Sequence, residues 1–267
     1  MISIKRFRQT IYDYYNKNKR NFPWRETTNP YHILVSEIML QQTQTSRVQG
    51  KYENFIREFP DFKTLYHAKI RKILAVWQGL GYNRRAVALH KIAQIVIKDF
   101  NGHLPQTTQA LDKLPGIGPS TASAIVAFAY NKPTVFIETN IRTVYCHFFF
   151  SELDKVNDHD ILDRVSQTLD TSNVRDWYYA LFDYGVMLKQ KENLSQKSAH
   201  YRKQSPYKGS NREVRSKIIR LLLSSPPMSN REIDQSLNIN PGQSRDNLIQ
   251  LQREGLLTKV KGKFTIA

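Results

Sequence analysis

Cysteine is almost absent from the sequence, and long apolar runs are absent altogether. Cys146 is the single cysteine of 267 residues, which excludes an internal disulfide and any metal site built from several cysteines. The chain has no stretch of eighteen apolar residues, and its first residues lack the apolar segment of a secretory signal. We therefore expect a cytoplasmic globular protein with one large domain or with a large and a small one.

Acidic residues are scarce relative to basic ones. The 23 aspartates and glutamates stand against 40 lysines and arginines, which gives a formal net charge of +17. The resulting pI is about 9.9. So large an excess of positive charge indicates a polyanionic partner, and nucleic acid fits this composition best.

Alternation of strand type is absent before residue 190, where apolar residues recur instead at intervals of three and four. Prolines and glycines divide this region into segments, and Thr28-Asn29-Pro30 is a typical start of a helix. The pattern predicts a mainly α-helical region with helices over residues 31–47, 68–77, 84–100, 112–114 and 120–130.

The composition changes after residue 188, where basic residues dominate and a segment containing serine, proline and glycine follows. This change predicts a basic linker at residues 206–212. The remainder is typical of a winged helix, with helices over 213–223, 229–237 and 243–253 before a hairpin of 256–260 and 263–266. Arg245, Asn247 and Gln250 on the third helix are candidates for contact with a DNA groove, and a domain that contacts only proteins is an equal alternative.

The sequence Leu114-Pro115-Gly116-Ile117-Gly118 predicts a tight turn that opens a helix. Proline presets φ for the turn, and the two glycines permit a close approach of the backbone to another molecule. The first amides of the following helix would then point at an anion such as a DNA phosphate. A turn of this kind is ambiguous by itself. The predicted phosphate-binding residues are Leu114, Gly116, Ile117, Gly118, Ser120 and Thr121.

Several motifs occur in an order typical of one enzyme family. They are Phe22-Pro23-Trp24-Arg25, Ser36-Glu37-Ile38-Met39-Leu40-Gln41-Gln42-Thr43-Gln44, Gln78-Gly79-Leu80-Gly81-Tyr82, the turn at 114–118 and Ala180-Leu181-Phe182-Asp183-Tyr184-Gly185. Together they resemble the MutY-type adenine DNA glycosylases of the helix-hairpin-helix superfamily, which includes endonuclease III. The run at 36–44 is highly specific. The resemblance implies a mainly α, two-lobed helix-hairpin-helix glycosylase fold in residues 1–205, followed by the linker and a winged-helix domain at 213–267.

The resemblance assigns the chemistry to two carboxyl groups. Removing a base from deoxyribose requires an acid that protonates the base and an ionised carboxylate that stabilises the positive sugar. Glu37 resembles the acid, which needs a raised pKa; a plain surface glutamate is the alternative. Glu138 stands where the family usually has aspartate and would stabilise or bond the sugar cation, oriented by Asn140, unless it only caps the next helix. We expect the two carboxyl groups to converge on one cleft.

The resemblance also assigns residues to the flipping of a nucleotide out of the duplex. Gln42 and Tyr82 would insert at the opposite base, and Leu40 would support the gap. Core packing is the alternative for Leu40 and for Trp24, one of the proposed pocket residues. The residues that would line the pocket for the flipped base are Trp24, Arg25, Asp183 and Ser120.

Parts typical of the family are missing from this chain. Relatives that cut the DNA strand carry a lysine where Ser120 stands, so we expect a monofunctional glycosylase. The four cysteines of the family's iron–sulfur cluster are absent, so we expect no such cofactor, although the turn could hold a monovalent cation. We expect the basic tract at 189–208 to contact phosphates instead. The large C-terminal domain that recognises 8-oxoguanine is also missing, and the winged helix stands in its place.

The expected function is the excision of mispaired adenine from double-stranded DNA in base excision repair, by a nucleoid-associated monomer. Two alternatives remain open. One is a glycosylase for mismatched thymine or uracil, or for another damaged base. The other is a catalytically inactive DNA-binding protein, in which the change to Glu138 has abolished the chemistry.

Overall fold

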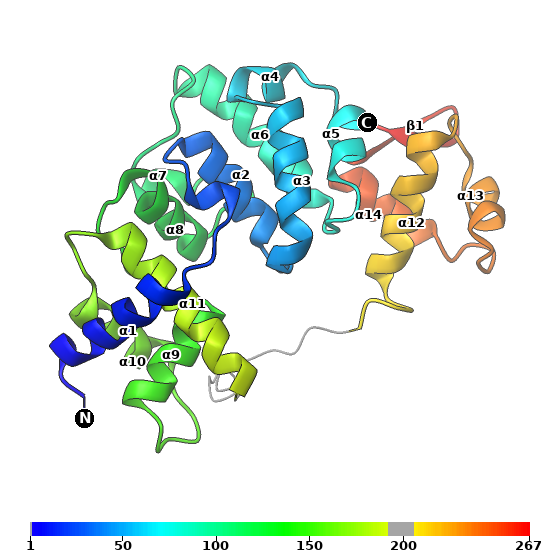
Figure 1. The fold of residues 1–267 in the computed structure, drawn as a ribbon. Helices are drawn as coiled ribbons and strands as arrows, with labels where there is room; N and C mark the ends of the chain where they lie inside the picture. The colour runs from blue at the N-terminus through cyan, green and yellow to red at the C-terminus, as the bar shows by residue number, and fades with distance from the viewer. Residues whose placement is uncertain (1, 192–205) are drawn as a thin grey trace. The chain divides into compact units, whose positions relative to one another are not determined.

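The described part of the chain is mainly helical. The computed structural model describes residues 2–191 and 206–267, and Figure 1 shows helices throughout with a short β-hairpin near the C-terminus. None of the helices in these two ranges has the length and apolar character needed to cross a bilayer. The elements are α1 (Ile4–Asn18), the 3₁₀-helix η1 (Pro23–Arg25), α2 (Pro30–Leu40), α3 (Thr45–Glu58), α4 (Phe62–His67), α5 (Ile70–Trp77), α6 (Arg84–Asp99), α7 (Thr108–Leu111), α8 (Pro119–Tyr130), α9 (Thr139–Phe149), α10 (Asp158–Thr168), α11 (Val174–Lys191), α12 (Asn211–Ser224), α13 (Asn230–Leu237), α14 (Arg245–Arg253), β1 (Leu257–Val260) and β2 (Lys263–Ile266).

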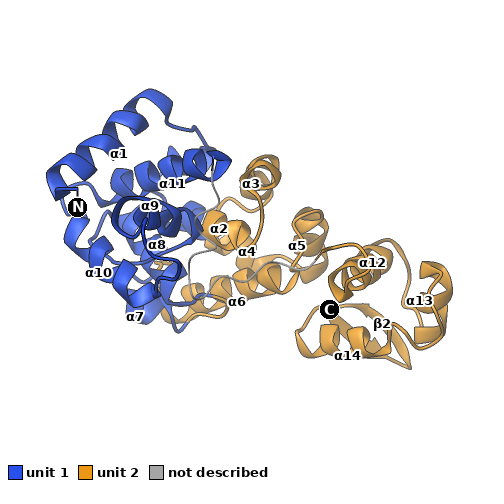
Figure 2. Ribbon diagram, turned by 90° about the horizontal axis from the view of Figure 1, so that it is seen from below, with its two compact units in different colours: residues 1–34, 105–113, 117–203 blue, residues 35–104, 114–116, 204–267 orange. Residues whose placement is uncertain are grey.

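The chain forms two compact units, coloured separately in Figure 2. Unit 1 contains residues 1–34, 105–113 and 117–203, and unit 2 contains residues 35–104, 114–116 and 204–267. The units do not follow the sequential division predicted from composition, because the C-terminal segment packs with residues 35–104 inside unit 2.

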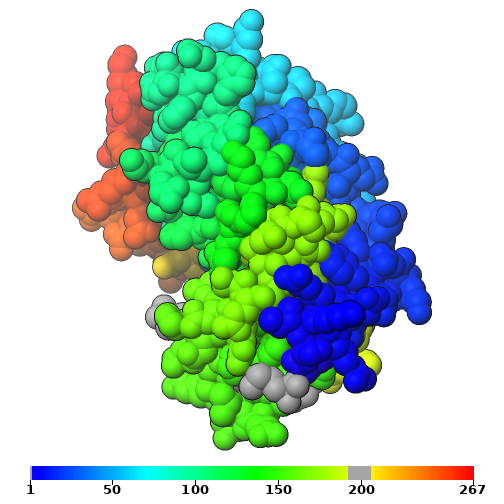
Figure 3. Space-filling model, turned by 90° about the vertical axis from the view of Figure 1, so that its left-hand side faces the viewer, coloured from blue at the N-terminus to red at the C-terminus, as the bar shows by residue number. Residues whose placement is uncertain are grey.

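Unit 1 is built around an aromatic core beneath α1, α9 and α11. Phe7 packs edge-on against Tyr145 and Trp177, with ring centroids 5.5 and 5.7 Å apart, and all three side chains are fully buried. Such edge-to-face pairs add about 0.5–1.5 kcal/mol each to the effect of burying apolar area. Figure 3 shows α1, in dark blue, lying along the yellow-green α11. Cys146 belongs to this core, so the single cysteine is a packing residue.

Two helices predicted from the sequence differ from those in the structure. The helix expected over 31–47 ends at Leu40, and α3 starts only at Thr45, because the chain turns between them with Gln42 at a φ of 55°. Residues 41–44 contain neither glycine nor proline, so no local signal marks this break. The short helix expected over 112–114 is also wrong, since Thr107 caps α7 a turn earlier.

The C-terminal segment of unit 2 contains three helices followed by a hairpin, which is the order expected of a winged helix. β1 pairs antiparallel with β2, which confirms the predicted hairpin, and the turn between them has left-handed backbone at Lys261 and Gly262. An isolated antiparallel β-bridge joins Met228 to Phe264 of β2.

The residues of α14 proposed to contact a DNA groove do not all face outward. Asn247 is 7% exposed, so its prediction as a groove contact is wrong. Gln250 accepts a hydrogen bond from Arg215 at 3.2 Å, and Arg245 is exposed. The apolar periodicity of a short helix could not place Asn247 on the buried face, because its side chain is polar.

Candidate functional site

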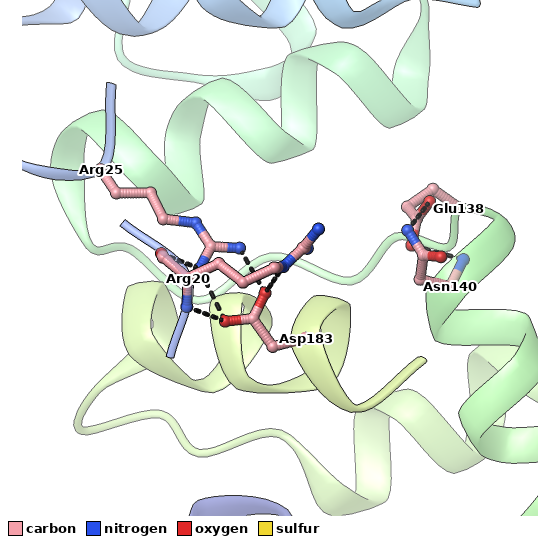
Figure 4. Close-up of polar contacts among 5 residues, drawn as sticks. All are labelled: Arg20, Arg25, Glu138, Asn140 and Asp183. Carbon is pink, nitrogen blue, oxygen red and sulfur yellow. Dashed lines mark hydrogen bonds and ion pairs between the residues drawn. The ribbon is translucent and has the colours of Figure 1, made fainter. Parts of the chain in front are cut away.

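Two arginines of the N-terminal segment converge on one buried aspartate in unit 1. Asp183 of α11 is 2% exposed, and it accepts from Arg20 Nε at 2.6 Å and from the two terminal nitrogens of Arg25 at 2.8 and 2.9 Å (Figure 4). The backbone N–H of Arg20 also donates to it, at 3.0 Å. Burial raises the pKa of Asp183, but the hydrogen bonds and charges of the two arginines outweigh it and hold the pKa below its ordinary value. Asp183 is therefore an ionised anchor for the segment that carries Arg25.

Packing completes the placement of Trp24 and Arg25 on η1. Trp24 is 4% exposed and stacks on Phe22 with 5.0 Å between ring centroids. The Arg25 guanidinium lies 4.5 Å from the centre of the Tyr179 ring. The burial of Trp24 agrees with the core alternative, and the Arg25 side chain is only 8% exposed. Asp183 accepts hydrogen bonds from Arg25 directly. The assignment of Trp24, Arg25 and Asp183 to a base pocket stays a prediction.

Glu138 occupies the N-cap of α9 and is bonded to the start of that helix. Its Oε1 accepts from the backbone N–H of Asn140 at 2.6 Å and of Ile141 at 2.9 Å. Its Oε2 accepts from the side-chain amide of Asn140 at 3.2 Å (Figure 4). The structure thus contains both the cap and the contact with Asn140 that the sequence suggested. One role does not exclude the other, because a capping carboxylate remains a negative charge at a fixed place.

Burial is the main influence on the protonation of Glu138. Burial raises the pKa of its carboxyl group above the ordinary value, although the amides of Ile141 and Asn140 and the charges of Lys189 and Arg142 act in the opposite direction. Lys189 is partly buried on α11, and burial lowers its pKa while Glu138 opposes that change. Glu138 is only partly buried, and an additional positive charge beside its carboxylate would favour the ionised form.

Gly185 determines how closely α11 can approach Glu138 and Asn140. A Cβ added at Gly185 would lie 2.5 Å from the backbone oxygen of Asn140 and 2.7 Å from its Cβ. Backbone atoms cannot move aside as a flexible side chain can. Glycine is therefore required here for close packing between α11 and the start of α9.

The predicted phosphate-binding turn divides between the units. Leu114 and Gly116 belong to unit 2, and Ile117 and the residues after it belong to unit 1. Gly116 has a φ of 79°, and a Cβ at this position would lie 2.9 Å from the Cβ of Ala88. The carbonyl of Gly116 accepts from the side chain of Gln41 at 3.1 Å. Conformation and space therefore both require glycine here.

The helix after the turn starts as the sequence predicted. Gly118 occupies the N-cap of α8, and Pro119 follows in its first turn. Amides in the first turn of a helix have no acceptor within the helix, and together they give its N-terminus a partial positive charge. Ser120 is exposed, and Thr121 is partly exposed. These features suit an anion, and phosphate binding at this turn stays a prediction.

Gln42 and Tyr82, which are far apart in the chain, lie together in unit 2. Their φ angles are 55° and 45°, in the left-handed region that is unfavourable for residues with a side chain. Both line one cavity of about 340 Å³, together with Ile38, Arg85 and Gly116. The predicted insertion residues are thus held in unusual backbone conformations beside the glycine of the turn.

A single buried arginine holds the two segments that carry Gln42 and Tyr82. Arg85 of α6 is 6% exposed, and its guanidinium lies 5.4 Å from the centre of the Tyr82 ring. Burial lowers the pKa of Arg85 to about 10, so it remains charged at neutral pH. The guanidinium donates to the carbonyl groups of Ile38 (3.0 Å), Met39 (2.8 Å), Gln41 (2.5 Å), Leu80 (3.1 Å) and Gly81 (3.1 Å) and to the hydroxyl of Thr43 (3.0 Å).

Glu37 and Leu40 are the partly exposed members of the C-terminal half of α2. Ser36, Ile38 and Met39 around them are buried. The side chain of Glu37 is therefore accessible although its neighbours belong to the core. Glu37 belongs to unit 2 and Glu138 to unit 1, and the convergence of their carboxyl groups stays a prediction.

Sequence reasoning missed Arg85 and Gly185. Arg85 is adjacent to Arg84 in a strongly basic chain, so nothing in the sequence separates it from a surface charge. Gly185 did carry a signal, because a glycine inside a helix costs about 1 kcal/mol relative to alanine and so indicates a packing requirement.

The residues of this chain do not provide an iron–sulfur site. Cys146 is the only cysteine in the whole sequence and is fully buried in the core of unit 1, so a set of cysteine ligands cannot form. Most of the basic tract at 189–208, which we expected to contact phosphates, lies outside the described residues.

Replacing Gly185 with alanine tests the close packing of α11. We expect Gly185→Ala to reduce the free energy of unfolding by about 1–3 kcal/mol, because the new methyl group meets backbone atoms. Gly50 of α3 is the matched control: nothing lies within 4 Å of a Cβ added there, so Gly50→Ala should stabilise the protein by about 0.5–1 kcal/mol. Urea unfolding measures both variants. Equal stabilisation by the two alanines would contradict the packing argument.

Replacing Glu138 with glutamine tests the cost of its partly buried charge. A carboxyl group with a raised folded-state pKa stabilises the protein most below its ordinary value of 4.5, and this contribution is lost as the pH rises through the folded pKa. Glutamine keeps an acceptor for the helix amides without the charge. The melting temperature of Glu138→Gln should therefore rise relative to wild type between pH 4.5 and pH 8. The control is Glu152→Gln, at an exposed position of the same unit; a Glu138→Gln difference that falls with rising pH would contradict the assignment.

Replacing Arg85 with methionine tests its role in holding the two turns. We expect Arg85→Met to lower the free energy of unfolding by about 3 kcal/mol, because several buried carbonyl groups lose their donor. Lys91→Met, at an exposed position on the same helix, should change it by less than about 0.5 kcal/mol. Denaturant titration of the two variants makes the comparison, and equal stabilities would show that the buried hydrogen bonds contribute nothing.

Comparison with known proteins identifies relatives of this chain. The adenine DNA glycosylase of Buchnera aphidicola subsp. Baizongia pistaciae is 35% identical over 189 residues, which cover 70% of this chain and 54% of that protein. The thymine/uracil-DNA glycosylase of Methanothermobacter thermautotrophicus is 30% identical over 187 residues, which cover 69% of this chain and 85% of that protein. The structure of a thermostable thymine-DNA glycosylase matches with a TM-score of 0.63 and 27% identity, and covers 69% of this chain and 86% of that one.

These matches confirm the helix-hairpin-helix fold expected from the sequence. The chain spans about half the length of the Buchnera protein, and most of the length of the Methanothermobacter protein. Residues 35–165 match the description "HhH-GPD superfamily base excision DNA repair protein", and this range includes Glu37, Gln42, Tyr82 and Glu138. The chain therefore belongs to the HhH-GPD superfamily of base excision DNA repair proteins.

Proposed function

We propose that this protein is a monofunctional DNA glycosylase that acts, as a monomer, on a mispaired adenine in double-stranded DNA. One observation carries the proposal: Gln42 and Tyr82 share one cavity, and both have left-handed backbone held by Arg85. Unfavourable backbone maintained by buried hydrogen bonds is typical of functional positions. Side chains fixed in this way could fill the gap left in a base stack when a nucleotide flips out.

The carboxyl groups of Glu37 and Glu138 have different roles in the proposed reaction. Glu37 donates a proton to the base as the N-glycosidic bond breaks, so the base leaves neutral rather than as an anion. Glu138 stabilises the positive charge that develops on the sugar, and water then adds to the sugar to leave an abasic site. The contacts of Glu138 support this role, because the amides of Asn140 and Ile141 hold its carboxylate at a fixed place.

Other residues bind and orient the DNA. The turn at Gly116 and Gly118 and the start of α8 bind a backbone phosphate of the strand that carries the flipped nucleotide. Arg25, fixed by Asp183, contributes a charged donor to the base pocket. Asn140 keeps the carboxylate of Glu138 in place through its side-chain amide.

Ser120 supports hydrolysis without strand cleavage. A glycosylase that also cuts the strand needs an amine that forms a Schiff base with the sugar. Ser120 lies exposed at the start of α8, where its hydroxyl cannot form such an adduct. The reaction therefore ends at the abasic site.

A second substrate class has its own support. One relative, of whose length this chain covers 85%, is named a thymine/uracil-DNA glycosylase, and one structural match is a thymine-DNA glycosylase. The excision of mismatched thymine or uracil is thus the alternative to adenine. The run at 36–44, which resembles adenine glycosylases, favours adenine.

Base release tests both the reaction and its substrate. Duplexes carrying adenine opposite guanine or 8-oxoguanine, thymine opposite guanine, or uracil opposite guanine are incubated with the protein, and abasic sites are cut with alkali. We expect release of adenine, and strand cleavage only after alkali. Release of thymine or uracil alone would replace adenine with the second candidate, and cleavage without alkali would contradict the monofunctional assignment.

Replacing Glu37 with glutamine tests the proposed acid. We expect Glu37→Gln to reduce the single-turnover rate of base release by about 10²–10⁴-fold, because glutamine cannot donate the proton. Its melting temperature and DNA affinity should stay near those of the wild type, since Glu37 is partly exposed. Undiminished base release by Glu37→Gln would remove Glu37 from the mechanism.

A further inference from the structure

The C-terminal segment of unit 2 reaches the proposed insertion residues. Arg71 of α5 donates to the carbonyl groups of Leu222 and Leu223, at 3.1 and 2.8 Å, near the end of α12. Near the start of α12, Arg212 donates to the hydroxyl of Tyr82 at 2.9 Å and lies 5.5 Å from the centre of its ring. The end of α12 is thus attached to α5, and its start is attached to Tyr82.

Two guanidinium groups from different parts of unit 2 thus lie close to the Tyr82 ring. Arg85 lies 5.4 Å from the ring centre and Arg212 lies 5.5 Å from it. A cation near the face of an aromatic ring is attracted to it, more strongly as the pair is desolvated. The C-terminal segment thus contributes to the position of Tyr82.

This contact forms one side of a basic groove, which we call the α12 groove. It is a cavity of about 410 Å³ whose described lining includes three arginines, several side-chain amides and no acidic residue. Arg47 and Arg220 are exposed, and the Tyr207 side chain is 51% exposed. The residues that matter for its chemistry are Gln42, Arg47, Tyr82, Tyr207, Arg212 and Arg220.

Gln42 and Tyr82 line two cavities. One of these cavities also contains Gly116 of the phosphate-binding turn, and the other is the α12 groove. If the turn binds the strand with the flipped nucleotide, the inserted side chains separate that strand from its partner. The α12 groove then lies on the side of the partner strand.

We propose that the α12 groove binds the DNA strand opposite the excised base, with its arginines on phosphates and its tyrosine and amide side chains at the unpaired base. This inference rests on the proposed function. Arginine is suited to phosphate, and aromatic rings and amides are suited to an unstacked base. The C-terminal segment thus reads the opposite strand through α12, rather than through α14.

The position of α14 supports this assignment. Gln250 and Leu251 of α14, and Glu254 directly after it, line a second cavity together with Tyr82 and Arg212. The Gln250 and Glu254 side chains are also bonded to Arg215 of α12. This end of α14 therefore faces its own unit.

Binding to DNA that cannot be cut tests the groove. The probe is a duplex with a tetrahydrofuran abasic analogue opposite guanine, and the measurement is fluorescence anisotropy over a range of salt concentrations. We expect Arg220→Gln to weaken duplex binding about five- to tenfold and to reduce the salt slope by about one. The affinity for the single strand that carries the analogue should change less than twofold, because the partner strand is missing.

Arg231→Gln is the matched control, since it removes one positive charge from an exposed position on α13, away from the groove. It should change duplex affinity less than twofold. Equal effects of Arg220→Gln and Arg231→Gln on the duplex would overturn the proposal. So would an equal effect of Arg220→Gln on the duplex and on the single strand.

Crosslinking separates this proposal from the proposed function. With 5-iodouracil in the strand opposite the analogue, irradiation should join that strand to the peptide containing Tyr207 or to the one containing Tyr82. Crosslinks from the analogue strand alone would contradict the groove assignment. Failure of the wild-type protein to release any base, with opposite-strand crosslinks intact, would contradict the proposed function and support the groove.

Discussion

The part of unit 2 that carries Gln42 and Tyr82 depends on the buried guanidinium of Arg85. It satisfies the carbonyl groups at the end of α2 and those in the loop before α6 with one positive charge. Both segments need it, because Gln42 and Tyr82 have left-handed backbone that neither turn would favour alone. Without this donor, several buried carbonyl groups would lose a hydrogen-bond partner. The conformation of one segment is thus coupled to that of the other.

Helix α11 has a similar role within unit 1. Asp183 fixes Arg25 through a buried ion pair, and Gly185, half a turn later, lets the start of α9 approach. Lys189, a further turn along, affects the charge of Glu138. Helix α11 thus positions both the arginine proposed for the base pocket and the carboxylate proposed to stabilise the sugar cation. The arginine and the carboxylate both belong to charge pairs that are partly shielded from water. The same groups therefore affect both the stability and the proposed function of the protein.

Local features of the site could be predicted, and long-range ones could not. The contact of Glu138 with Asn140 depends on three consecutive residues at a helix start, where capping rules apply. The break between α2 and α3 depends instead on Arg85, which is more than forty residues away in the chain. Because apolar periodicity carries no sign of such a contact, the predicted helix continued through the break. Asn247 was predicted to face DNA because it is polar, although tertiary packing buries it. Gln42 and Tyr82 were identified through family resemblance, since no local rule joins them.

Base extrusion by a rigid pair of inserted side chains is the central claim, and 2-aminopurine fluorescence tests it most directly. This adenine analogue is quenched when stacked in a duplex and becomes bright when it leaves the stack. On a duplex with 2-aminopurine in place of the mispaired adenine, the account predicts a fluorescence rise with wild-type protein. It predicts little or no rise with Arg85→Met at concentrations and temperatures where that variant is folded and bound. An equal rise with both proteins would contradict the claim that Arg85 holds the side chains that extrude the base.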